Sequence, residues 1–153
     1  MRNPATARLV KLLQEFVQSS DRYVDATGGR NRMHRTDMNA LSVVMRYELA
    51  GSPPTPSELG RELNLSSPAT TALLDRLERS GHVARERVDT DRRRVRVRMT
   101  PKAYEDGGRM FGPLGRELGA VIAGYSPEQV EMLSVFMEDA VAAVERAAKQ
   151  QDT

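Results

Sequence analysis

Basic residues dominate the segment from position 82 to position 102. Eight Lys or Arg residues stand there against three acidic residues, which gives a local charge of +5 in a chain whose net charge is +2. Arginines clustered in this way favour phosphate as a partner, because the planar guanidinium pairs with phosphate oxygens and stays charged at any physiological pH. The segment therefore predicts a surface that binds the phosphate backbone of a nucleic acid.

A helix-turn-helix is predicted directly before this basic segment. Thr55, Pro56 and Glu58 follow the order of a capping box, with a hydroxyl N-cap, a proline in the first turn and a glutamate three residues after the cap. A second start signal follows at Ser66-Ser67-Pro68. The helix that begins there has small or apolar residues at the spacing of one buried face, namely Thr70, Leu73, Leu74 and Leu77.

The remaining faces of this second helix carry mostly small and polar residues. Such side chains let a helix backbone come close to base edges, so the helix suits the major groove of DNA. Gly81 then occupies the position that closes a helix in the left-handed conformation. The residues expected at the DNA are Ser66, Ser67, Pro68, Ala69, Thr71, Ala72 and Arg76.

A change of period after Gly81 predicts two β-strands joined by a polar turn over residues 89–93. The residues expected inside are Val83, Val88, Val95, Val97 and Met99. The residues expected to alternate outward are Arg94, Arg96 and Arg98. The predicted hairpin thus carries the basic charge beside the helix-turn-helix.

Together these motifs resemble the MarR family of winged-helix transcriptional regulators. The resemblance rests on G-x-V-x-R at Gly81–Arg85, on D-x-R at Asp91–Arg93 and on Met-Thr-Pro at 99–101. The run Leu73–Glu78 also looks like the recognition helix of that family. The resemblance implies a mainly α fold with a small β-wing, in which N- and C-terminal dimerisation helices flank a winged helix-turn-helix domain.

The resemblance also implies a division of the chain. Residues 36–100 correspond to the DNA-binding domain, and residues 1–35 and 101–153 to the helical dimerisation region. Within the second region, helices are expected over 5–26, over 101–125 and from Ser126 onward. The segment 27–35 is expected to be a loop, because it contains Gly28-Gly29, and a helix over 36–50 is expected to start with a cap at Thr36-Asp37.

Single residues take roles from the family pattern. Thr71 matches a threonine that faces the groove, and Arg85 matches a basic residue that contacts phosphate. In the wing, Asp91 matches a carboxylate that orients Arg93 toward the minor groove, and Arg92 and Arg94 would add phosphate contacts. A solvated strand face is the alternative for any one of these arginines, but their clustering favours the DNA-binding interpretation.

Ala72 departs from the family pattern, because many members carry a long basic residue there. We therefore expect base readout by this helix to depend on small contacts and on DNA shape. The wing and the phosphate contacts would then supply much of the affinity.

The family further implies a homodimer that represses transcription from a palindromic operator in double-stranded DNA. A small aromatic or anionic effector that binds near the junction of the dimerisation helices and the winged domain would release it. The candidate effector-binding residues are Tyr23, His34, Arg35, Met38 and Met45. Core packing is the alternative for the methionines, which fill irregular core gaps more often than they line a pocket.

Composition excludes several other classes of function. The chain contains no cysteine, so it forms no disulfide and offers no thiol to a metal or an oxidant. It has no apolar run long enough for a membrane span, and a cytoplasmic location is expected. No catalytic motif is present, and no metal or cofactor is expected. The remaining alternative is a winged-helix architectural or protein-interaction module that binds DNA only non-specifically.

Overall fold

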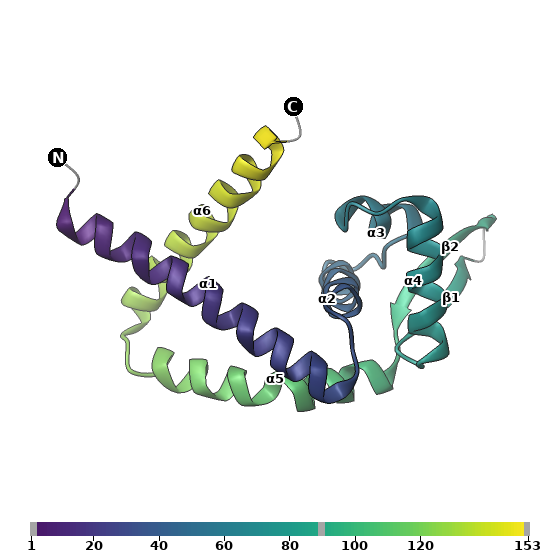
Figure 1. Ribbon diagram of the computed structural model, residues 1–153, viewed down its shortest axis with the longest axis horizontal. Coiled ribbons are helices and arrows are strands. Elements are labelled where there is room, and N and C mark those ends of the chain that lie inside the picture. The colour runs from purple at the N-terminus through teal and green to yellow at the C-terminus, as the bar shows by residue number, and fades with distance from the viewer. Residues whose placement is uncertain (1–2, 89–90, 152–153) are drawn as a thin grey trace. The chain divides into compact units, whose positions relative to one another are not determined.

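The computed structural model describes residues 3–88 and 91–151, which contain six helices and a two-stranded sheet (Figure 1). The elements follow the order α1 (Pro4–Asn31), α2 (Arg35–Leu49), α3 (Pro56–Glu62), α4 (Ser67–Arg79), β1 (Val83–Val88), β2 (Asp91–Met99), α5 (Pro101–Ile122) and α6 (Pro127–Gln151). The chain divides into two compact units, Met1–Met110 and Phe111–Thr153. The predicted fold class, mainly α with a small β-wing, is confirmed. The functional division at residues 35 and 101 stays a prediction, since compactness alone does not test it.

The helix-turn-helix forms where the capping signals predict it. At the start of α3 the Thr55 backbone N–H donates to Glu58 Oε2 at 2.7 Å, and the Glu58 N–H donates to Thr55 Oγ1 at 3.2 Å. The Ser66 hydroxyl caps α4 by accepting from the Ala69 N–H at 3.3 Å. These bonds satisfy backbone donors that a helix start leaves without partners.

The core of the first unit lies between α2, α3, α4 and the wing. Its fully buried members are Ala40, Val44, Leu59, Leu73, Leu74, Leu77, Val83 and Val97. The close approach of α3 and α4 depends on Gly60, because a Cβ there would lie 2.5 Å from Thr70 Oγ1. The buried face predicted for α4 is therefore the face by which α4 packs on the core.

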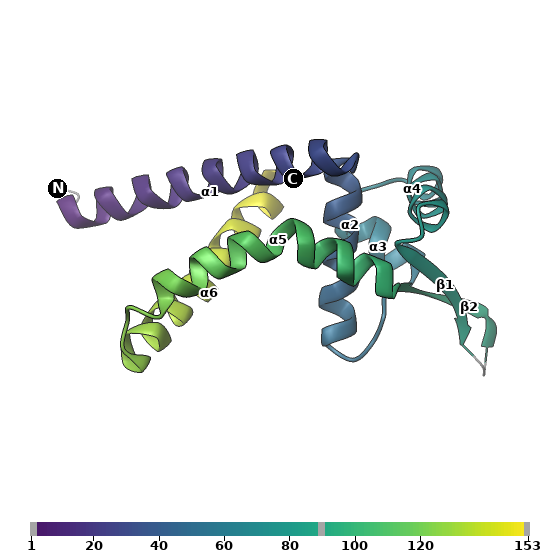
Figure 2. The ribbon, with the colours of Figure 1, turned by 90° about the horizontal axis from the view of Figure 1, so that it is seen from below.

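The wing is an antiparallel pair of strands that leaves the end of α4 (Figure 2). Gly81 precedes it with a φ of +79°, as the left-handed closure of α4 requires. Val83 pairs with Met99, and the Val97 N–H donates to Pro54 O at 2.8 Å, which ties the sheet to the segment before α3. The predicted turn was too long, because β2 already begins at Asp91.

The predicted loop over residues 27–35 is wrong for most of its length. Helix α1 continues through Gly28 and Gly29 to Asn31, and Arg32 ends it with a φ of +55°. Gly28 is buried, and a Cβ there would lie 2.6 Å from the Met38 side chain, so the glycine serves helix packing. The N-cap of α2 is His34, and Asp37 stands at the third helical position instead of at the cap.

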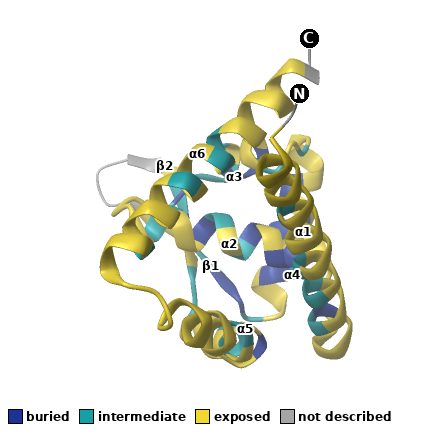
Figure 3. Cartoon of the chain, turned by 90° about the vertical axis from the view of Figure 1, so that its left-hand side faces the viewer, coloured by how far each residue is buried: buried dark blue, intermediate teal, exposed yellow. Residues whose placement is uncertain are grey.

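The second unit holds the last turns of α5 and all of α6. The Ser126 N–H donates to Gln129 Oε1 at 2.9 Å and starts α6 as predicted. Figure 3 shows exposed residues along nearly all of α6, and α1 is similarly exposed over its first half. Large apolar side chains are among them, including Leu9, Phe16 and Val17 on α1 and Leu133, Met137, Val141 and Val144 on α6.

Candidate nucleic-acid interface

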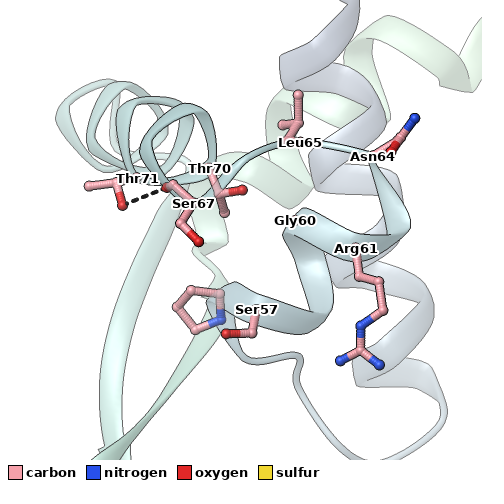
Figure 4. Close-up of a pocket in the computed structure, with 9 residues that line it drawn as sticks. Ser57, Gly60, Arg61, Asn64, Leu65, Ser67, Thr70 and Thr71 are labelled. Atoms are coloured by element: carbon pink, nitrogen blue, oxygen red, sulfur yellow. Dashed lines mark hydrogen bonds between the residues drawn. The ribbon is translucent and has the colours of Figure 1, made fainter.

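The face of α4 that points away from the core carries short, exposed side chains in its first turns. Ser67, Pro68, Ala69, Thr71 and Ala72 are all exposed, as expected for residues that approach DNA. Residues of α3 and of the first turns of α4 line an open groove of about 550 Å³ (Figure 4). Its polar members are Ser57, Arg61, Asn64, Ser67, Thr70 and Thr71. The groove exposes hydroxyl, amide and guanidinium groups at the start of the second helix.

Thr71 uses its hydroxyl inside the helix. Its Oγ1 donates to the Ser67 carbonyl at 3.0 Å, one turn earlier (Figure 4). The same bond recurs at the buried Thr70, whose hydroxyl donates to Ser66 O at 2.9 Å. The exposed part that Thr71 offers to a partner is therefore its methyl group, together with the remaining acceptor capacity of its oxygen.

The Arg76 side chain is not directed outward from α4 but pairs with Asp37 on α2. Its Nε and Nη2 donate to Asp37 Oδ1 at 3.0 and 2.5 Å. The hydrogen bond to Asp37 raises the pKa of the Arg76 guanidinium above its usual value. Asp37 is buried and also accepts from the His34 N–H, so one carboxylate joins the start of α2 to the recognition helix.

Arg85, the predicted phosphate contact, bridges two carboxylates of α4. Its Nη2 donates to Asp75 Oδ1 at 2.7 Å and its Nη1 to Glu78 Oε2 at 2.8 Å. This arrangement joins the first strand of the wing to the recognition helix. A phosphate contact by Arg85 stays a prediction, and it would have to share or replace these two carboxylates.

The described part of the wing is less uniformly basic than the sequence implies. Arg94 is exposed, as predicted, but Arg96 turns inward and donates to Pro53 O at 2.8 Å. Arg98 is exposed and pairs with Glu86 at 2.6 Å. The backbone of Asp91, Arg92 and Arg93 lies in β2, but their side chains lie outside the described part of the structure, so the wing pair stays a prediction.

A buried histidine that the sequence did not predict as important, His82, joins the start of β1 to α5. His82 Nδ1 lies 2.7 Å from Ser80 Oγ, and His82 Nε2 lies 2.9 Å from Asp106 Oδ2. Lys102 Nζ also donates to Asp106 Oδ2 at 2.6 Å, and Arg109 donates to its other oxygen. Hydrogen bonds from Lys102, His82 and Arg109 hold the pKa of Asp106 well below its usual range.

This cluster contains serine, histidine and aspartate, but it is structural. The Ser80 hydroxyl donates its proton to the Leu77 carbonyl at 3.0 Å and is not poised as a nucleophile. Only the spacing of Lys102 and Asp106, four residues apart on one helix, could have signalled it in the sequence. Among the described residues, no group of three or more His, Asp or Glu side chains could hold a metal ion.

The five candidate effector-binding residues lie in different surroundings. Tyr23 donates from its hydroxyl to Met110 O at 2.7 Å, and Arg35 forms ion pairs with Asp21 and Asp25 of α1. Hydrogen bonds to these two carboxylates raise the pKa of Arg35. Met38 is buried against Gly28, whereas His34 and Met45 are exposed. Met38 thus fits the core-packing alternative, and an effector site stays a prediction.

A helix-turn-helix followed by a β-wing defines the winged-helix class of protein. Residues 34–94 match the model of the MarR family. The uncharacterised HTH-type transcriptional regulator YcgE of Bacillus subtilis (strain 168) is 36% identical over 102 residues. That match covers 67% of this chain and 64% of YcgE, so the chain spans less than two thirds of that relative.

Solved structures share the fold over nearly the whole chain. A mutant of S. aureus MepR superimposes with a TM-score of 0.74 at 14% identity, covering 94% of this chain and 99% of that one. A MarR family protein from Bacillus stearothermophilus gives 0.68 at 23% identity, covering 95% and 99%. S. aureus MepR has also been solved with DNA and with ethidium bromide.

The winged-helix segment of this chain thus matches the MarR family, and the chain shares its fold with a solved member of that family. Regulators of this family are DNA-binding transcription factors and not enzymes. None of the helices within residues 3–88 and 91–151 is long and apolar enough to cross a membrane.

Proposed function

We propose that the protein is a sequence-specific regulator that binds a palindromic operator in double-stranded DNA as a homodimer and represses transcription. The observation that carries the proposal is the outer face of α4, which is exposed, free of bulky side chains in its first turns and bordered by the groove with α3. Such a face can approach base edges in the major groove, while the exposed Arg61 and Arg94 would supply phosphate contacts. Since it would act on the chromosome, we place the protein in the cytoplasm.

The homodimer is supported by the apolar residues that the single chain leaves exposed. Val141 and Val144 on α6 are 54% and 70% exposed, and Leu9, Phe16 and Val17 on α1 are about half exposed. Exposed apolar surface on this scale marks an interaction site. A two-fold dimer would place two copies of α4 about one DNA turn, roughly 34 Å, apart.

Oligomeric state tests the dimer directly. We expect Val141→Asp to shift the protein from dimer to monomer in sedimentation at micromolar concentration, because it places a charge among the exposed apolar side chains of α6. Arg146→Asp is the matched control, since helical spacing puts position 146 on the other side of α6. A dimer that tolerates Val141→Asp and dissociates with Arg146→Asp would contradict this assignment of the interface.

Selection of bound duplexes from a random pool tests the function. At about 150 mM salt, a near-physiological ionic strength, we expect an enriched inverted repeat with half-sites about one turn apart. A specific regulator should prefer it over random DNA by roughly a thousand-fold or more. Retention without an enriched motif would instead identify an architectural, non-specific binder.

Release by a small aromatic or anionic effector belongs to the same proposal. It is supported by the ethidium complex of S. aureus MepR, whose fold this chain shares. A screen of aromatic acids and cationic dyes against the operator complex tests it. If no compound that binds the free protein weakens the complex, release by an effector is refuted.

A further inference from the structure

The outward stripe of the first turns of α4 is apolar. Thr70, Leu73, Leu74 and Leu77 are buried, and helical spacing places Pro68 and Ala72 opposite them, with Asp75 next on the same stripe. Positions 67–75 contain no Arg, Lys, Asn or Gln. The polar groups nearest the stripe are bonded within the protein, because Thr71 donates to Ser67 O and Asp75 accepts from Arg85.

Two of the long basic side chains that could read guanine near this stripe, those of Arg76 and Arg85, are engaged within the protein. A guanine is read by a bidentate Arg or Lys in the major groove. Arg76 is held by Asp37 at the inner edge of α4, and Arg85 is held by Asp75 and Glu78. Arg79 is exposed but lies seven residues beyond Ala72, about 10 Å further along the helix, near the end expected to meet the phosphate backbone.

We propose that α4 selects thymine, through contacts between its apolar stripe and the C5-methyl group of that base. The contacting groups are the Pro68 ring, the Ala72 methyl and the Thr71 methyl. Thymine is the one base with an apolar group in the major groove, and alanine and threonine methyl groups are its usual partners. This inference rests on the proposed function, since it names the base pairs that α4 reads within the operator.

Replacing thymine by deoxyuridine tests the proposal, because uracil lacks only the C5-methyl group. Each thymine of the selected half-site is replaced in turn, and the affinity of the wild-type dimer is measured at constant salt. Burial of one methyl group corresponds to about a four-fold change in affinity. We expect a loss of that order at one to three adjacent positions and no loss at the others.

The Ala72→Ser variant assigns the contact to the helix. It exchanges one hydrogen of the Ala72 methyl for a hydroxyl, and we expect the thymine-to-uracil affinity ratio to fall toward one at a single position. The other thymines of the same duplex serve as internal controls. Melting temperatures of both proteins are compared first, so that a change of fold is not mistaken for a change of contact.

The outcomes separate this inference from the proposed function. A dimer that binds its selected operator specifically but shows no uracil effect at any position would overturn the thymine readout and leave the regulator function intact. Guanines enriched and required at the positions that face Pro68 and Ala72 would overturn it as well. Equal affinity for selected and random duplexes would refute the proposed function and this inference together.

Discussion

The ion pair between Asp37 and Arg76 decides whether Arg76 positions the recognition helix or reads DNA. The Asp37 side chain is only 7% exposed, whereas that of Arg76 is 43% exposed. Removing one partner of a fully buried pair costs about 3–5 kcal/mol. Because water reaches the guanidinium side, we expect Arg76→Met to cost about 2 kcal/mol. Methionine retains much of the apolar stem, so the loss reports mainly on the charge.

Unfolding of four proteins measures this coupling. The wild type, Arg76→Met, Asp37→Asn and the double variant are unfolded thermally at one protein concentration, since dimerisation would otherwise shift the midpoint. A loss of about 2 kcal/mol lowers the melting temperature by roughly 4–8 °C in a chain of this size. We expect the double variant to lose about 1 kcal/mol less stability than the sum of the losses in the two single variants.

DNA binding by the same proteins distinguishes the two roles. Asp37 is buried and cannot touch DNA, so a similar loss of operator affinity in Asp37→Asn and Arg76→Met would show that the pair acts by holding α4. A positioning role for Arg76 is refuted if Arg76→Met weakens binding without changing stability while Asp37→Asn binds normally. Arg76 would then be a direct DNA contact, as the sequence pattern suggested.

Three further predictions concern the scaffold of the same unit. The pKa of Asp106 is depressed by its basic neighbours, so its contribution to stability is present above a pH of about 4 and is lost as the pH falls toward the lower folded pKa. Asp106→Asn should therefore cost at least about 1.5 kcal/mol at pH 7 and make stability less dependent on pH below pH 4. An unchanged pH dependence of unfolding below pH 4 would refute this. Gly60→Ala should lower stability and operator affinity because the new methyl group collides with Thr70. Gly107→Ala, where nothing lies within 4 Å of the new methyl group, should instead stabilise the protein by up to about 1 kcal/mol. Equal unfolding midpoints for the two variants would contradict the close approach of α3 and α4. Thr55→Ala should cost about 1 kcal/mol in chemical denaturation by removing the capping box of α3, and a loss below a few tenths would show that packing alone fixes that start.

Local features of this protein were determined by the sequence itself. The starts at Thr55, Ser66 and Ser126 depend on bonds between residues no more than three positions apart, so residue type and spacing suffice to predict them. The buried face of α4 follows from the helical period, and the closure at Gly81 follows from the backbone freedom of glycine. The resulting order of elements was enough to predict a winged helix.

Tertiary structure decided what the polar side chains do. Arg76 and Asp37 are 39 residues apart, and Asp106 lies 24 residues from His82, so no local pattern could pair them. Helix α1 continues past Gly28 because Met38 packs on that glycine, and this contact outweighs the local tendency of a glycine pair to end a helix. Charge counts along the chain predicted a basic wing, but the fold turned several of its arginines toward carboxylates and carbonyls brought close only by folding.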